Sequence, residues 1–527
     1  MIRILPKDKF HGSNKRRASG SSGQPLFADL DLNLLWLQTE LGNSPDLTVR
    51  RLTSPNNPSI RIALVFIDGL VDAHIIAHLM SESLIPELRE MSPTGGASEL
   101  LRLFLEQNLA TGSVNQVVQL EQIFGSISEG KAVILLDGLT IALTAEASGG
   151  EKRAVEEPTS QTVVRGPKES FTESIRTNTS LLRRRIKSPA LRIQVKKIGT
   201  QTQTDIAIVY LQGIANDLIV QEIQNRLDSI NTDSILESGY IEEFIQDATF
   251  TPFPTIQNTE RPDAAASSIL EGQIAILVDG TPFVLIAPVT FFKFFQSSED
   301  YYQRYDISTF LRIIRYVAFL VSMLLPSLYI AITTFHQEML PTTLLVSLAA
   351  QREGIPFPAI IEALIMEITF EVLREAGVRM PRVIGPAISI VGALVLGQAA
   401  VQAGLVSAAM VIVVSFTAIA NFVIPSINMA IAARLIRFVM MFFAATLGLF
   451  GIMSGLMILL IHMAGLRSFG IPYLMPLAPL IASNLKDVFI RFPWWAMIKR
   501  PRFIASGNMQ RQSGNQQPKP PDDRLLE

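Results

Sequence analysis

Residues 271–288 read EGQIAILVDGTPFVLIAP, two short apolar runs on either side of Asp279-Gly280. Apolar runs of this length around Asp-Gly are typical of a β-hairpin, because glycine tolerates the positive φ that a tight turn requires. Residues 129–146, EGKAVILLDGLTIALTAE, show the same pattern around Asp137-Gly138. The chain therefore carries two copies of one strand–turn–strand element, 142 residues apart.

The repeat extends outward from the two hairpins. The runs RIALVFID (61–68) and DIAIVYLQG (205–213) are strand-like, reach a glycine at Gly69 and Gly213, and precede apolar residues at helical spacing. We predict a soluble N-terminal half of the α+β or α/β class, built from two related subdomains at 46–150 and 191–295. An all-α polytopic membrane domain follows it.

The aspartates of the two turns have two interpretations. A carboxylate beside a glycine is able to bind a metal or a phosphate-linked cation. A catalytic aspartate would not obviously need a twin in a similar hairpin, so we interpret Asp137, Gly138, Asp279 and Gly280 as structural turns. In the second copy, Thr281-Pro282 follows and indicates a longer or distorted turn.

Residues 151–190 connect the copies and end in a basic amphipathic helix. Its basic side chains either contact anionic headgroups or an acidic partner, or are simply solvated; they are Arg183, Arg184, Arg185 and Lys187. His74 and His78 have the spacing of zinc ligands on a helix, but no third ligand accompanies them, and we interpret them as surface residues.

The second half of the chain has the composition of a membrane protein. Of the 527 residues, 48% are hydrophobic, and there is no cysteine. Residues 316–335, 383–433 and 438–466 contain no charged side chain, and about 20 such residues span the hydrocarbon core of a bilayer. As one helix, 383–433 would reach about 77 Å, so it must fold back, and Gln402-Ala403-Gly404 is the natural turn.

The predicted organisation follows from these segments. It comprises a basic, largely disordered tail (1–45), the subdomains and linker given above, a connector (296–312), a membrane domain (313–482), an interfacial basic and aromatic segment (483–504) and a disordered tail (505–527). Spans are expected near 313–333, 383–403, 405–425 and 438–464, with partial or interfacial pieces near 339–375 and 469–482. No signal peptide precedes residue 316, and the arginines flank the spans on one side, so we expect the N-terminal half to be cytoplasmic.

Carboxylates recur four residues apart at Glu367, Glu371 and Glu375, which places them on one face of a helix. They either face water on an interfacial helix or line a water-filled path for cations. With Glu362, Gln398, Gln402 and Asn421 they form our candidate pore or gating residues. The amides have a second interpretation as hydrogen-bonding groups between packed helices.

Several long blocks resemble the A subunits of the GerA-type spore germinant receptors of endospore-forming bacteria. They include ESIRTNTSLLRRRIKSP (173–189), PFPTIQNTERPD (252–263) and EITFEVLREAGVRMP (367–381). The resemblance implies a multi-pass subunit of the spore inner membrane that responds to nutrients together with a transporter-like B subunit and a lipoprotein C subunit. It further implies a homo-oligomer that opens as a channel for monovalent cations.

Other classes of function remain open. Discontinuous spans with buried carboxylates also suit a secondary transporter, and a membrane-anchored scaffold for the other receptor subunits is a third hypothesis. No nucleophile–base pair, phosphate-binding loop or metal constellation is evident, so we predict no enzymatic activity, no cofactor and no nucleic-acid partner.

Overall fold

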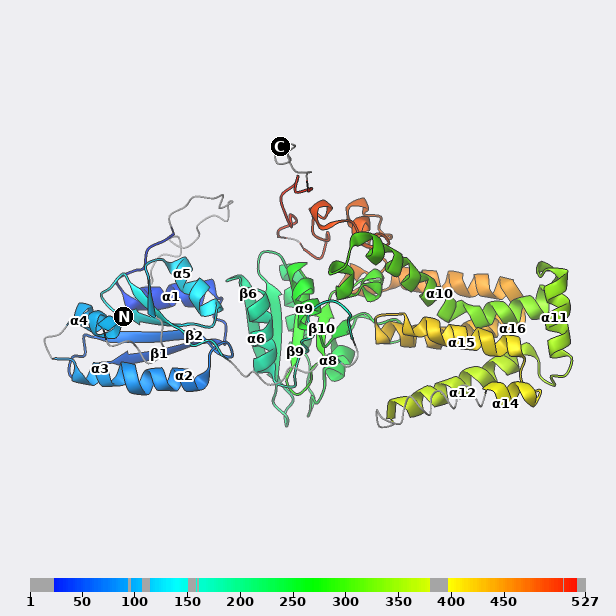
Figure 1. The fold of residues 1–527 in the computed structure, drawn as a ribbon, viewed down its shortest axis with the longest axis horizontal. Helices are drawn as coiled ribbons and strands as arrows, with labels where there is room; N and C mark the ends of the chain where they lie inside the picture. The colour runs from blue at the N-terminus through cyan, green and yellow to red at the C-terminus, as the bar shows by residue number, and fades with distance from the viewer. Residues whose placement is uncertain are drawn as a thin grey trace, which may run out of the picture. The chain divides into compact units, whose positions relative to one another are not determined.

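Residues 23–92, 96–106, 114–149, 158, 161–379, 397–505 and 507–518 are described by a computed structural model of the chain (Figure 1). The chain divides into two compact units. The first unit contains residues 1–153 and 179–192, and the second contains residues 154–178 and 193–527.

The first unit is a five-stranded sheet with helices on both faces, in the strand order β1-β2-β4-β5-β3. Alternate residues of β2 point to opposite faces. Leu64 packs with α2, α3 and α4, and Val65 packs with α1 and α5. The elements are α1 (Leu30–Glu40), β1 (Leu47–Thr53), β2 (Arg61–Ile67), α2 (Ala73–His78), a π-helical turn (Leu79–Leu84), α3 (Ile85–Glu90), α4 (Ala97–Glu106), β3 (Val114–Val117), α5 (Leu120–Ser128), β4 (Ala132–Leu136) and β5 (Ala142–Ala145).

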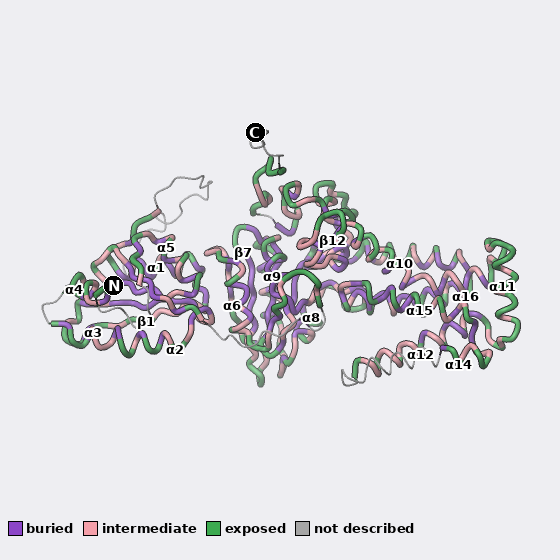
Figure 2. The backbone as a smooth tube through the Cα atoms, viewed as in Figure 1, coloured by how far each residue is buried: buried purple, intermediate pink, exposed green. Residues whose placement is uncertain are grey.

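The second sheet repeats this topology, with the order β6-β7-β9-β10-β8. The central strands of both sheets, β2, β4 and β5 in the first and β7, β9 and β10 in the second, are mainly buried (Figure 2). The elements are α6 (Ile175–Arg185), β6 (Leu191–Ile198), β7 (Thr204–Leu211), α7 (Asp217–Asp228), α8 (Ser238–Ile245), β8 (Gln257–Thr259), α9 (Pro262–Leu270), β9 (Ile274–Val278) and β10 (Val284–Ala287). The identical strand order shows that the two subdomains are related in fold as well as in sequence.

The prediction of a disordered tail over 1–45 is wrong for the part of it that forms α1. This helix has an N-cap at Asp29 and buries Leu30, Leu34 and Leu37 against the first sheet. Its counterpart in the second copy is α6. Each helix has an asparagine, Asn33 or Asn178, that exchanges two hydrogen bonds with the backbone six residues before it.

The C-terminal half is helical. Its helices are α10 (Tyr305–Phe335), α11 (Thr342–Arg352), α12 (Ala359–Arg379), α14 (Gly397–Gln402), α15 (Ala408–Phe422) and α16 (Ile427–Gly465). Among the residues that the structure describes, α10 and α16 are long and apolar enough to cross a membrane. Helix α10 begins within the predicted connector, and α16 begins eleven residues before the predicted span. Most of the predicted span at 383–403 lies outside the described residues.

Helix α16 is a hairpin of two helices. Gly448 has φ 62° and ψ −140°, which is not a helical conformation. A methyl group on Gly455 would meet the sulfur of Met440, and one on Gly451 would meet the carbonyl of Phe443. These contacts join residues on either side of Gly448, so 427–447 and 449–465 lie antiparallel.

The residues after α16 fold against the second sheet domain, and they include the piece near 469–482 that was predicted as partial or interfacial. Tyr473 is fully buried and donates a hydrogen bond of 2.8 Å to the carbonyl of Pro254. The predicted disordered tail from 505 is also wrong in its first part, because Ala505 bridges Ala215 and Arg511 pairs with Glu271 at 2.7 Å. Residues of the second sheet domain supply the partners that the isolated segment lacks.

Candidate functional site

Both Asp-Gly pairs lie in the turns that join paired strands, β4 to β5 and β9 to β10. Gly138 and Gly280 have φ of 85° and 90°. The carboxylates have a further role, since Asp137 accepts the N–H of Leu30 and Asp279 accepts the N–H of Ile175, each at 3.0 Å. Each aspartate therefore caps the first residue of a helix distant in sequence.

Asp137 also binds the guanidinium of Arg61, with distances of 2.9 and 2.7 Å. Burial by itself would raise the pKa of this carboxyl group. The hydrogen bonds from Leu30 and Arg61 outweigh burial and lower the pKa below its ordinary value. A carboxylate held in this way is a structural group.

The basic cluster of α6 is divided by the fold. Arg183 is buried and donates to Asp46 and to Ser44, both at 2.8 Å, so the predicted contact with headgroups or a partner is wrong for this residue. Arg184 and Lys187 are exposed, and Arg185 is half-buried. Helical periodicity turns only part of such a cluster toward solvent.

His74 and His78 are both exposed on α2. The Nδ1 atom of His78 lies 3.1 Å from a carboxylate oxygen of Glu82, one turn later. This arrangement is a solvent-exposed pair on one helix.

The acidic helix is α12, and two of its carboxylates, Glu362 and Glu367, are buried in the interior of the helical region. Glu367 is fully buried and forms an ion pair with Arg437, which is 1% exposed. Arg437 Nε also donates to the carbonyl of Ser322 in α10, at 2.6 Å. This ion pair therefore joins α10, α12 and α16.

Glu371 lies one turn further along α12 and is shared by two arginines. Arg434 Nη1 is 2.6 Å from one of its oxygens, and Arg374 Nη1 is 3.5 Å from the other. At the opposite end of the helix, Glu362 accepts both the N–H and the hydroxyl of Ser407, at 3.0 and 2.9 Å, and lies 3.4 Å from Arg352. We call this set the α12 network: Arg352, Glu362, Glu367, Glu371, Arg374, Arg434 and Arg437.

The other candidate polar residues are divided between the interior and the surface. Asn421 is buried, donates to the carbonyl of Ala430 at 3.0 Å and accepts from Arg374 at 3.3 Å, which is the helix-packing role. Gln398 and Gln402 are exposed on α14. Glu375 is exposed and pairs with Arg379 on its own helix.

The α12 network differs from the expectation of an interfacial helix with its glutamates toward water. Glu362 and Glu367 do not face water, and three glutamates are matched by four arginines. Spacing along one helix identified the acids, but all of their arginine partners except Arg374 lie on other helices. Buried charges among apolar helices are costly and are kept where they serve function.

A second buried charge cluster was missed in the sequence. Arg312 in α10 is fully buried and binds Asp487 at 2.9 Å and Asp300 at 3.2 Å. Arg315 binds Asp300 at 2.7 Å. Burial, and next the charge of Asp487, raise the pKa of the Tyr301 phenol, which stays protonated and donates to Asp487 at 2.7 Å. This cluster joins the start of α10 to the residues that follow α16, which we call the C-terminal segment (466–518).

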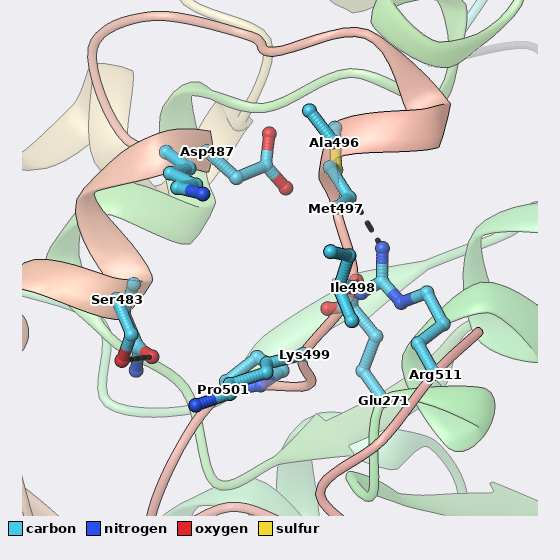
Figure 3. A pocket seen from close by; sticks show the side chains of 11 residues that line it. Glu271, Ser483, Asp487, Ala496, Met497, Ile498, Lys499, Pro501 and Arg511 are labelled. Atoms are coloured by element: carbon cyan, nitrogen blue, oxygen red, sulfur yellow. Dashed lines mark hydrogen bonds and ion pairs between the residues drawn. The ribbon is translucent and has the colours of Figure 1, made fainter. Parts of the chain in front are cut away.

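The C-terminal segment also forms one wall of a pocket of about 240 Å³ (Figure 3). Glu271 projects from the second sheet domain, and Arg511 lies beside it and contacts the sulfur of Met497 at 3.6 Å. Lys486 and Lys499 line the same pocket with Asp487. Positive and negative side chains are mixed here, so the lining favours no single class of ligand.

Residues 36–503 match the profile of the Bacillus/Clostridium GerA spore germination proteins. The chain belongs to this family. It is 49% identical over 492 residues to spore germination protein KA of Bacillus subtilis, which covers 93% of this chain and 90% of that one.

The chain is also similar to two further proteins. The uncharacterized membrane protein YfkQ of Bacillus subtilis is 46% identical, over 88% of this chain and 89% of its own. The crystal structure of the N-terminal domain of the A subunit of the Bacillus megaterium spore germinant receptor GerK3 is 38% identical, with a TM-score of 0.40, and covers 51% of this chain and 99% of that one. A role in spore germination follows from membership of the family.

Proposed function

We propose that this protein is the membrane subunit of a nutrient germinant receptor and that it oligomerises into a gated channel for monovalent cations. It acts in the spore inner membrane with a transporter-like B subunit and a lipoprotein C subunit. Its helical region crosses the bilayer several times. Its sheet domains and the segment after α16 lie on the cytoplasmic side.

The directions of the helices support a multi-pass arrangement. Ser322 of α10 contacts Arg437, and a methyl on Gly448 would meet Phe335 at the end of α10, so 427–447 runs parallel to α10. Helix α12 runs the opposite way, because Glu362 lies beside Ser407 and Arg374 lies beside Asn421 at the far end of α15. Helix α12 thus supplies the return path that α10 requires.

The observation that carries the gating proposal is the buried pair of Glu367 and Arg437. Both side chains are at most 1% exposed, and the two helices that carry them both pack on α10. A pair of opposite charges in a dry environment is stable only while the two groups remain together. We propose that it holds α12 and α16 together in the closed state, and that opening separates them and exposes the carboxylates to cations.

Potassium release from spores tests this proposal. We expect Glu367→Gln to release potassium without nutrient, because Arg437 loses its partner. Glu375→Gln removes an equal charge from an exposed position of the same helix and is expected to behave as wild type. If the Glu367→Gln protein fails to accumulate, the exchanged pair Glu367→Arg with Arg437→Glu is expected to restore its level.

Two results would contradict the proposal. Normal nutrient-dependent release from Glu367→Gln spores that contain normal amounts of the protein would exclude the gating role of the pair. Release that persists in spores lacking this subunit, with its partner subunits present, would exclude the channel and favour a scaffold.

A further inference from the structure

A pocket of about 530 Å³ lies between the second sheet domain and the helical region, both within the second unit of the chain. One wall is polar and comes from Gln257, Asn258 and Thr259 of β8. The opposite wall comes from the ends of α12 and α15 and the start of α16. It carries Arg374 and Arg434 beside apolar side chains that include Phe422.

Positive charge exceeds negative charge in this pocket. Arg374 and Arg434 share a single carboxylate, Glu371. Arg261 also lines the pocket, but it is buried and neutralised by Asp263 at 2.7 Å. Among the described residues, the neighbouring pairs are each balanced, namely Glu375–Arg379 and Glu367–Arg437. Arg374 and Arg434 thus carry one more positive charge than the carboxylate that they share.

The two arginines hold unused hydrogen-bond donors. The Nε atoms of Arg374 and Arg434 are buried, and neither has a hydrogen-bond partner among the residues that the structure describes. Arg374 is held between two aromatic rings, with its guanidinium 5.3 Å from Phe370 and 5.2 Å from Phe422. Buried donors normally have partners, and the described residues offer these two Nε atoms no acceptor in hydrogen-bonding geometry, so the pair is organised for an acceptor on a ligand.

The chemistry of this acceptor follows from the two walls. Planar guanidinium groups match the oxygens of a phosphate, and a basic pocket between membrane helices on the cytoplasmic side is suited to an anionic headgroup. Gln257 adds a buried Oε1 that accepts no hydrogen bond from the described part of the chain, which suits a headgroup hydroxyl. The apolar side chains near Phe422 suit acyl chains.

We propose that this pocket binds the phosphate of an anionic phospholipid. The inference rests on the proposed membrane location of these helices, but not on channel activity.

The test uses the full chain purified in detergent, and the probe is phosphatidylglycerol, with phosphatidylcholine for comparison. Lipid retained on the protein is counted by native mass spectrometry. We expect preferential retention of phosphatidylglycerol. We expect Arg374→Gln and Arg434→Gln each to weaken it about tenfold, since a charge-assisted hydrogen bond contributes about that factor. Arg379→Gln, an exposed arginine on the same helix, is the matched control and is expected to retain lipid as wild type does.

Glu371→Gln separates binding from structure. Removing the shared carboxylate frees both arginines, so phosphatidylglycerol retention is expected to rise, whereas a purely structural network would lose retention in this variant too. Equal retention of the two lipids by wild type, or equal loss in Arg379→Gln and Arg374→Gln, would overturn the proposal. Inorganic phosphate that displaces the lipid from wild type, but has no effect on Arg374→Gln, would identify a soluble phosphate as the ligand instead. None of these outcomes depends on potassium release.

Discussion

At the level of single residues, the aspartates of the two turns each hold a helix that lies far away in the chain. Asp137 receives the N–H of Leu30 and Asp279 receives that of Ile175. The glycines that follow them donate to the carbonyls of Ala28 and Glu173, at 2.8 and 2.7 Å. A free N–H at the start of a helix is stabilised by such an acceptor. The Asp-Gly pair thus closes a hairpin and fixes a helix with the same two residues.

Another carboxyl group, Glu242 on α8, is expected to make stability depend on pH. Burial, followed by repulsion from Glu237 and Glu243, raises its pKa to about 7. Because the pKa in the folded state lies above the ordinary value of about 4.3, the neutral form is favoured in the folded protein and stability falls as pH rises toward 7. We expect Glu242→Gln to raise the free energy of unfolding at pH 8 by on the order of 1 kcal/mol after solvent screening, and therefore to raise the Tm.

Thermal unfolding at pH 4.5 and pH 8 checks this expectation. The gain in Tm should be absent at pH 4.5, where Glu242 is protonated in the folded state. Glu243→Gln, at the exposed neighbouring position, should give a smaller gain. A gain of equal size at both pH values would mean that ionisation of Glu242 is not the cause.

At the level of elements, the helical region is organised by a few residues that interrupt or join helices. Gly448 reverses α16, and the ion pair of Glu367 and Arg437 joins α12 to that hairpin. Near the base of α10, Phe291, Phe295 and Phe319 pack edge to face, with ring centroids 5.0 to 5.8 Å apart. These rings join the second sheet domain to α10 and provide a route for mechanical coupling between them.

The reversal at Gly448 predicts a strong effect of Gly448→Ala. Its φ of 62° with ψ of −140° is a conformation that only glycine adopts readily, and a Cβ there would lie 2.9 Å from Phe335 Cβ. We expect a loss of about 1–3 kcal/mol in the free energy of unfolding, seen as a lower Tm of the purified protein. Gly465→Ala, where a Cβ would meet no atom within 4 Å, is the control. Equal Tm values for the two variants would argue against the hairpin.

At the level of the whole molecule, the proposed topology places both sheet domains on one side of the membrane and the turn between α11 and α12 on the other. Labelling single introduced cysteines tests it without interference, because the natural chain contains no cysteine. Val164 is 93% exposed beside the second sheet, and Gly354 is exposed between α11 and α12. We expect an impermeant maleimide added outside intact cells to label Gly354→Cys and not Val164→Cys.

Permeabilised cells provide the control for this experiment, since both variants should then be labelled. Labelling of Val164→Cys in intact cells would reverse the proposed orientation. If both residues are labelled only after permeabilisation, Gly354 lies on the same side of the membrane as Val164. This result would contradict the proposal that α10 crosses the membrane and that α12 returns.

Local chemistry in the sequence was sufficient for the two-copy soluble half, its Asp-Gly turns and the apolar helical half, because strand period, turn residues and runs of uncharged residues depend on near neighbours. It also placed Glu367, Glu371 and Glu375 on one face of a helix. Only the tertiary structure decided that α1 belongs to the first sheet, that α16 reverses at Gly448, that the C-terminal segment packs on the second sheet, and that the acids of α12 are paired with arginines. The physical reason is the same in each case, since these features depend on partners that lie tens to hundreds of residues away.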